Sequence, residues 1–403
     1  MAFGGPFMNG PSAPPAPFPF HRANAFDPAP EFAAFREGPP CRVSLPDGTE
    51  HWLVSRHADV REALAHPGLS ADDQHPAFPR MFPLPPVPGA LSFLRMDDPD
   101  HGRLRRALAA EFTVRRTNRL RPGITETVDA LLDTMAAASP PADLVEHFAL
   151  PLPSLVICGL LGVPYADREF FQSRSVASLS LTLSDEETGA AFGELAGYLD
   201  RLVSDKEHEP TDDLLGRTVA RVADGALGHD ELVSIARLLL VAGHETTASM
   251  IGLGTLALLN RPDQLALLRD DPGLIPQAVE ELLRYLTVVQ RGTARVTTEP
   301  VRLGGVAIPA GEGVIIALPA ANRDPDRYSD PDALNLTRSA QHHVAFGFGM
   351  HQCIGQTLAR VEMEIAFTRL LDRFPNLSLA CDPAELRFRE SIIYGVQRLP
   401  VAW

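Results

Sequence analysis

Apolar residues recur along most of the chain at the three- and four-residue spacing of amphipathic helices. The patterns that predict helices cover residues 58–65, 120–135, 190–204, 211–223, 229–260 and 355–374. The helix over 229–260 is long for a globular protein, and its centre is almost entirely apolar. Such a helix is expected to be buried on most of its sides.

A smaller part of the chain has the pattern of β-strands. Residues 41–45 and 51–55 flank the turn signal at Pro46, Asp47 and Gly48, and together they predict a hairpin. Short apolar runs separated by glycines predict a small sheet over 292–317, and further short strands are expected near the C-terminus.

Two segments have no regular pattern. Residues 71–95 predict a long apolar loop, a kind of segment that often serves as a functional lid. The proline-rich residues 1–25 predict an extended N-terminal arm. Because we find no internal repeat and no linker, we predict one domain over residues 1–403, mainly α with a small β part.

Composition excludes several classes of protein. The chain has 36 Lys+Arg against 51 Asp+Glu, and its net charge of −15 argues against a nucleic-acid partner. The four cysteines, at 41, 158, 353 and 381, are too widely spaced for a zinc knuckle or a disulfide framework. Prolines interrupt any signal sequence, and no run approaches the ~20 apolar residues of a membrane span. We therefore expect a cytoplasmic protein without a membrane partner.

The segment Phe346-Gly-Phe-Gly349-Met-His351-Gln-Cys353-Ile-Gly355 directly precedes the last predicted helix. A helix N-terminus stabilises an anion, so we expect a lowered pKa for the Cys353 thiol. A thiolate is a soft donor that suits iron, and the glycines allow the backbone to approach a flat cofactor. Phe346 is expected to shield the sulfur. The spacing F-x-x-G-x-x-x-C-x-G predicts a haem with a thiolate ligand.

This segment resembles the haem-binding signature of the cytochrome P450 family. The resemblance extends over nearly the whole chain and is greatest to soluble, ferredoxin-dependent members from actinobacteria. It implies the P450 fold, with haem b between the long central helix and the helix that follows Cys353. Cys353 is then the axial ligand, and Phe346, Gly349 and Gly355 contact the cofactor.

The second motif, Ala242-Gly243-His244-Glu245-Thr246-Thr247, lies in the middle of the long helix. The threonines can donate to helix carbonyls and bend the helix. A zinc-protease motif that begins at His244 is excluded, because position 248 is alanine. The motif resembles the family's A-G-x-[D/E]-T sequence. That resemblance implies that Glu245 and Thr246 deliver protons to bound dioxygen, with Ala242 and Gly243 leaving room for it.

The third motif is Glu281-Leu-Leu-Arg284, whose charges share one helix face. It resembles the family's structural E-x-x-R pair, which ties its helix to the segment before the cysteine. The family's usual third partner belongs to a P-E-R-F-like stretch that this chain lacks. Arg338 lies at the corresponding distance, and we expect it to take that place.

Haem carries two propionate groups, which require cations and hydrogen-bond donors. The resemblance implies that four residues hold them: His101, Arg105, Arg295 and His351.

Seven arginines lie between residues 103 and 121. They form either a solvated helix face or a basic docking surface. The resemblance implies that an acidic ferredoxin docks here and passes on electrons from NAD(P)H and a ferredoxin reductase, with the enzyme acting as a monomer. The candidate docking residues are Arg103, Arg106, Arg115, Arg116 and Arg119.

The resemblance implies a monooxygenase that puts one oxygen atom of dioxygen into a small apolar molecule, by hydroxylation or epoxidation. We expect a secondary metabolite such as a polyketide, macrolide or terpenoid. The residues expected around it are Phe82, Leu84, Val87, Leu238, Val241, Val288, Val289 and Ile392. The alternatives are a P450 that catalyses coupling, rearrangement or peroxygenation, and a non-catalytic haem-binding protein.

Overall fold

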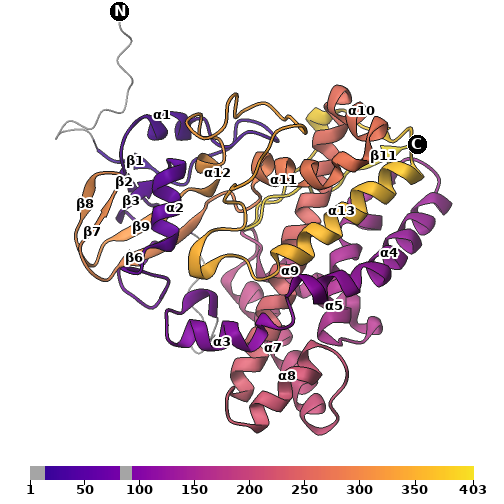
Figure 1. The fold of residues 1–403 in the computed structure, drawn as a ribbon, viewed down its shortest axis with the longest axis horizontal. Coiled ribbons are helices and arrows are strands. Elements are labelled where there is room, and N and C mark those ends of the chain that lie inside the picture. Colours follow the sequence, from indigo (N-terminus) through magenta and orange to yellow (C-terminus); the bar gives the residue numbers. More distant parts are fainter. Residues whose placement is uncertain (1–13, 82–92) are drawn as a thin grey trace, which may run out of the picture.

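The computed structural model describes residues 14–81 and 93–403 and is mainly helical (Figure 1). The helices are α1 (Glu31–Glu37), α2 (His57–Ala65), α3 (Asp100–Ala109), α4 (Val114–Ala137), α5 (Pro151–Leu161), α6 (Arg168–Ser178), α7 (Asp185–His208), α8 (Leu214–Ala223), α9 (His229–Leu259), α10 (Pro262–Asp270), α11 (Ile275–Leu286), α12 (Leu318–Ala321) and α13 (Gln356–Arg373).

The strands are short and form three sheets. They are β1 (Ala16–Pro17), β2 (Cys41–Ser44), β3 (Glu50–Val54), β4 (Leu69–Ser70), β5 (Ala142–Asp143), β6 (Thr293–Thr297), β7 (Val301–Leu303), β8 (Val306–Ile308), β9 (Gly313–Ile316), β10 (Ser378–Leu379) and β11 (Pro400–Ala402). The largest sheet has the order β1-β2-β3-β9-β6-β4, and the others are β10-β11-β5 and β7-β8.

The large sheet joins the N-terminal region to the second half of the chain. Strands β2 and β3 form the predicted antiparallel hairpin, with Cys41 opposite Leu53. Strand β9 adds to β3 in parallel, and β6 then pairs with β9 in the antiparallel sense, which places Arg295 opposite Val314. In Figure 1 this sheet lies at the left, apart from most of the helices.

Helix α9 is the central helix of the fold. Its second half, from Thr247 to Leu258, is buried without interruption. It packs against α5, α7, α11 and α13, which explains why its apolar residues do not keep to a single face. Helix α13, which follows Cys353, also lies alongside α4 (Figure 1).

The predicted fold class, mainly α with a small β part, is confirmed. The helix boundaries differ from the apolar patterns where capping residues set them. Helix α4 begins before residue 120 because the Thr113 side chain accepts a hydrogen bond from the Arg116 backbone N–H. Helix α7 begins at Asp185 because Ser184 and Glu187 form a capping box.

The N-terminal arm is not wholly irregular. Ala16 and Pro17 form β1, which pairs in parallel with β2. Within the described residues, no helix is long and apolar enough to cross a membrane.

Candidate functional site

Cys353 lies in a tight loop immediately before α13. The Cys353 backbone N–H donates to the Phe346 carbonyl at 2.9 Å and so closes the loop. Gly349 has φ +73°, and a Cβ there would come within 2.6 Å of the Leu64 carbonyl oxygen in α2. Glycine is therefore required at this position. At Gly355 a Cβ would meet no protein atom within 4 Å, so the side of the loop next to Cys353 is open.

The environment of the Cys353 thiol acts on its pKa in both directions. Although the side chain is accessible, protein surrounds it on most sides, and this burial raises the pKa. The Gly355 and Gln356 backbone N–H groups and the charges of Arg105 and Arg360 lower it. The helix N-terminus thus acts as predicted, but the predicted net decrease is wrong because burial has the larger effect. Arg360 also covers the Phe346 ring, with its guanidinium carbon 4.6 Å from the ring centroid.

The four residues predicted to bind propionates gather beside this loop. The rings of His101 and His351 lie 4.2 Å apart, and Arg105 donates to the Gln352 carbonyl at 2.6 Å. Arg295 is buried in β6, and burial, together with the charge of Arg95, lowers its pKa to about 10. Burial and the surrounding cations lower the pKa of His351 to about 3.

This cluster of cations fits two carboxylates. The Nε2 atoms of His101 and His351 are buried and have no hydrogen-bond partner among the described residues. Sequence reasoning missed Arg95, whose charge acts on both Arg295 and His351. No motif marks Arg95, although it directly precedes the segment that contains His101. Unpartnered histidine nitrogens and mutually repelling arginines beside an accessible thiol fit a haem with two propionates.

The Thr246 hydroxyl donates to the Ala242 carbonyl at 2.6 Å, four residues back along α9. Such a bond competes with the helix backbone bonds and favours a local bend. A Cβ at Gly243 would lie 3.2 Å from Ile157 Cδ1. The glycine therefore allows α9 to approach α5. Ala242 is exposed.

Glu245 has a charged partner that the sequence did not indicate. Its Oε2 accepts a hydrogen bond from Arg389 Nη1 at 2.5 Å, across 144 positions of sequence. Its Oε1 accepts no hydrogen bond from the described residues and lies 3.6 Å from His244 Nδ1. Burial raises the pKa of Glu245, and Arg389 acts against this rise. Burial also lowers the pKa of His244 to about 3, so this histidine is neutral.

Glu281 and Arg284 are fully buried on α11 and form a two-bond ion pair of 2.7 and 2.8 Å. Arg284 Nη1 also donates to the Asn322 and Pro331 carbonyls, both at 2.8 Å. Arg338 Nε donates to Glu281 Oε1 at 3.1 Å, as expected of the third partner. The network therefore ties α11 to the irregular segment that precedes the Cys353 loop.

The residues predicted to contact substrate come from three elements. Leu238 and Val241 lie on α9 and are partly buried. Val288 and Val289 follow α11, and Ile392 lies in the C-terminal segment. The remaining three predicted residues, Phe82, Leu84 and Val87, lie outside the described part of the chain.

The predicted basic docking surface is partly neutralised. Arg103 pairs with Glu231 and Arg116 with Glu111. Arg106, Arg115 and Arg119 are exposed and form no ion pair with any described residue.

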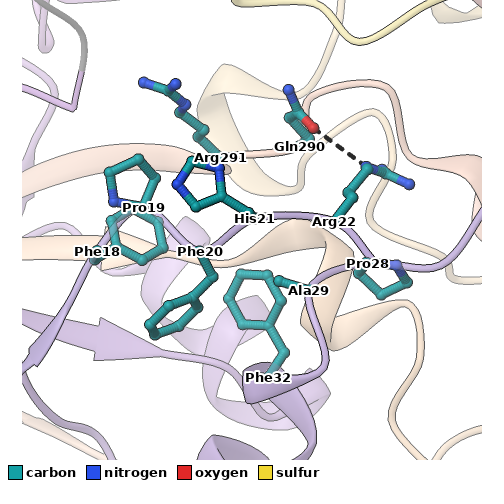
Figure 2. A pocket seen from close by; sticks show the side chains of 10 residues that line it. All are labelled: Phe18, Pro19, Phe20, His21, Arg22, Pro28, Ala29, Phe32, Gln290 and Arg291. Carbon is teal, nitrogen blue, oxygen red and sulfur yellow. Dashed lines mark hydrogen bonds between the residues drawn. The ribbon is translucent and has the colours of Figure 1, made fainter. Parts of the chain in front are cut away.

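A separate pocket of about 80 Å³ lies where the N-terminal segment meets the residues after α11 (Figure 2). Arg22 on its wall donates to Gln290 Oε1 at 3.2 Å and to the Leu286 carbonyl at 3.2 Å. The same guanidinium lies 4.2 Å from the ring centroid of Tyr394. Because Arg22 is held by the chain's own groups, we interpret these contacts as ones that fix the N-terminal segment to the residues after α11.

Comparison with known proteins places the chain in a family. A sequence model described as Cytochrome P450 matches residues 273–386. "Cytochrome P450-SU2" from Streptomyces griseolus is 50% identical over 387 residues, which cover 94% of each chain. "Pentalenic acid synthase" from Streptomyces avermitilis is 48% identical, covering 96% of this chain and 98% of the relative.

Among solved structures, the mycinamicin VIII C21 methyl hydroxylase from Micromonospora griseorubida is 42% identical and superposes with a TM-score of 0.91. The superposition covers 96% of this chain and all of that one. The cysteine loop, the central helix and the buried Glu–Arg network thus occur in a chain whose relatives cover 94–96% of its length. The chain belongs to the actinobacterial branch of the cytochrome P450 family and is a monooxygenase of that family.

Proposed function

We propose that this chain is a haem-thiolate monooxygenase with Cys353 as the axial ligand, acting on an apolar secondary metabolite. The observation that carries the proposal is the accessible Cys353 thiol beside a cluster of cations with unpartnered donors. His101, Arg105, Arg295 and His351 would bind the two propionates. When bound, haem activates dioxygen, so that one oxygen atom enters a C–H or C=C bond and the other leaves as water, using two electrons and two protons.

The chain's own residues would orient the substrate and supply protons. Glu245 has one unpartnered carboxylate oxygen, Oε1, and its raised pKa suits a group that gains and loses protons. Thr246 lies one position further along α9 and can rotate its hydroxyl away from the Ala242 carbonyl to donate elsewhere. We assign proton delivery to this pair.

The apolar residues of α9, of the segment after α11 and of the C-terminal segment support an apolar substrate. A mycinamicin hydroxylase and a pentalenic acid synthase are among the relatives, which supports a macrolide or terpenoid. Labelled dioxygen separates simple monooxygenation from coupling, rearrangement or peroxide-driven chemistry. The proposal requires one labelled oxygen atom in the product, and an unlabelled product would contradict it.

A carbon monoxide spectrum of the reduced protein tests the haem ligand. We expect a thiolate-type Soret band that Cys353→Ala abolishes. Cys381→Ala is the matched control, because it removes a partly buried thiol outside the cysteine loop and should leave the band in place. The assignment of Cys353 would be refuted if the band survived in Cys353→Ala.

For the electron donor we propose an acidic ferredoxin that docks on the three unpaired arginines, reduced by NAD(P)H through a ferredoxin reductase. Unpaired exposed cations produce a longer-ranged field than cations held in ion pairs. Arg106→Glu combined with Arg115→Glu should therefore lower ferredoxin-supported turnover at low salt. The control is Arg387→Glu, which changes an exposed arginine of the C-terminal segment. Arg103→Glu is a poorer control, because it would add a repulsion with the carboxylate that Arg103 pairs with. Equal turnover in all these variants at low salt would contradict the docking site.

A further inference from the structure

Arg389 lies in a C-terminal hairpin that packs on the central helix. Its backbone N–H donates to the Gly395 carbonyl at 2.8 Å, and Phe388 pairs with Val396 in an isolated β-bridge. The Arg389 side chain is 14% exposed and the Glu245 side chain 3%, so their ion pair is shielded from water. Among the described residues, Glu245 forms no other ion pair. His244 also lies nearby, but it is neutral.

The hairpin meets one face of α9. A Cβ at Gly395 would lie 2.5 Å from Ser249 Oγ, and a Cβ at Gly252 would lie 3.3 Å from Val396 Cγ1. Glu245, Ser249 and Gly252 are spaced at i, i+4 and i+7 and therefore share a helix face. The hairpin is thus held in close contact with α9, and Arg389 reaches Glu245 from this fixed base.

The tip of the same hairpin is bonded to the connection between α6 and α7. Ser391 Oγ donates to the Leu179 carbonyl at 3.0 Å, and Ser180 and Ser391 form an isolated antiparallel bridge. The Leu181 backbone N–H donates to the Glu390 carbonyl at 3.1 Å. Ile392, which sequence reasoning assigned to the substrate site, donates from its backbone to the Leu179 carbonyl at 3.4 Å.

Only Glu390 separates Arg389, bonded to the central helix, from Ser391, bonded to the α6–α7 connection. The two contacts therefore belong to one short segment of the hairpin, so that a change in one acts directly on the backbone that holds the other. We propose that Arg389 is a positioning residue for Glu245, and that residues 389–392 couple this positioning to the hydrogen bonds between the hairpin tip and the α6–α7 connection.

The physical consequence rests on the proposed role of Glu245 in proton delivery. Arg389 holds Oε2 and leaves Oε1 available, which fixes the direction in which the carboxylate can exchange a proton. When the α6–α7 connection is bonded to the hairpin, Arg389 is in place. Loss of these bonds would release the hairpin tip and with it the fixed orientation of the carboxylate. Proton delivery is thereby favoured only while the hairpin and the connection are bonded.

Coupling between two contacts is reciprocal, so it is tested from both sides. From the first side, Arg389→Gln in the haem-loaded protein should speed amide hydrogen exchange over residues 179–184 by about fivefold or more. Arg389→Lys, which keeps the charge, should restore part of the protection. The matched control is Arg387→Gln, because Arg387 is exposed and forms no ion pair with the described residues. Equal exchange in Arg389→Gln and Arg387→Gln would refute the coupling.

From the second side, Ser391→Ala removes a bond to Leu179 without touching Glu245. It should lower the product formed per reduced nicotinamide consumed and raise the solvent isotope effect on turnover, as should Arg389→Gln. Ser173→Ala is the control, because the exposed Ser173 hydroxyl donates only to the Phe170 carbonyl within α6. A purely structural role would lower stability in all variants without changing the isotope effect.

The two proposals fail in different ways. Faster exchange with an unchanged isotope effect and unchanged product yield in Arg389→Gln would refute the positioning role of Arg389, whereas the same two values unchanged in Glu245→Gln would refute proton delivery by Glu245. Unchanged exchange with an altered isotope effect would leave proton delivery by Glu245 intact and refute the coupling. Retention of the thiolate-type carbon monoxide spectrum in each variant shows that the haem pocket is preserved.

Discussion

Glu281 is a sensitive position because its carboxylate satisfies several buried donors at once. Oε1 accepts hydrogen bonds from Arg284 Nη2 at 2.8 Å, from Arg338 Nε at 3.1 Å and from the Asn335 backbone N–H at 3.0 Å. Oε2 accepts from Arg284 Nε at 2.7 Å. We predict that Glu281→Gln greatly lowers the free energy of unfolding, although it changes few atoms.

The magnitude follows from this arrangement. A glutamine that keeps its oxygen in the Oε1 position turns its NH₂ group toward Arg284 Nε, so that two donors face each other. It also removes the negative charge that pairs with the Arg284 guanidinium, and this guanidinium is 0% exposed. Breaking a buried pair in this way costs about 3–5 kcal/mol. Because folded proteins are stable by only about 5–15 kcal/mol, the loss is a large part of the total.

Urea unfolding of the haem-loaded protein, followed by far-ultraviolet circular dichroism and by loss of the Soret band, measures this effect. The matched control is Glu364→Gln, which makes the same change in an ion pair with Arg121 that is 42% and 21% exposed. That pair is expected to contribute less than about 1 kcal/mol. If Glu281→Gln cost no more than Glu364→Gln, the buried network would not stabilise the fold as reasoned.

Two further predictions concern stability. The hydrogen bond to Glu207, aided by Asp200, raises the pKa of His229 above its unfolded value. The contribution of His229 to the free energy of unfolding is therefore complete below about pH 6.5 and is lost as the pH rises through the folded pKa. The difference in melting temperature between the wild type and His229→Gln should therefore be largest near pH 5.5 and decrease as the pH rises through the folded pKa, and a constant difference would count against it. A Cβ at Gly254 would lie 2.7 Å from Phe367 Cζ. Gly254→Ala should therefore lower the unfolding free energy by about 1–3 kcal/mol in the same urea assay. No loss would mean that Phe367 can move aside.

The features that the sequence predicted well are those set by local patterns. The apolar content of residues 229–260 was enough to predict a buried central helix, and the spacing around Cys353 was enough to predict a tight loop before a helix. Both depend on residues close in the chain. Boundaries such as that at Thr113 differed because a capping hydrogen bond depends on one side chain, which apolar periodicity does not detect.

The features that the sequence could not predict depend on contacts between distant segments. Nothing near Arg389 in the sequence marks it as the partner of Glu245, because the pair forms only when the C-terminal hairpin packs on α9. The Cys353 pKa differed for a similar reason: the helix N-terminus is a local feature, but burial is a property of the whole fold. Likewise, Arg103 looked free in the sequence and is paired with Glu231 from α9.

The buried polar groups around Glu281 differ from those at the cysteine loop and the central helix in whether the protein supplies their partners. Around Glu281 the charges and donors are matched, as a network that only stabilises the fold should be. At the cysteine loop and the central helix, His101 Nε2, His351 Nε2 and Glu245 Oε1 are buried without partners among the described residues. Each such atom lowers stability by about 1–3 kcal/mol. Under the proposed function, the two histidine nitrogens would bind the cofactor's carboxylates and Glu245 Oε1 would exchange a proton, which accounts for their lack of partners in the protein.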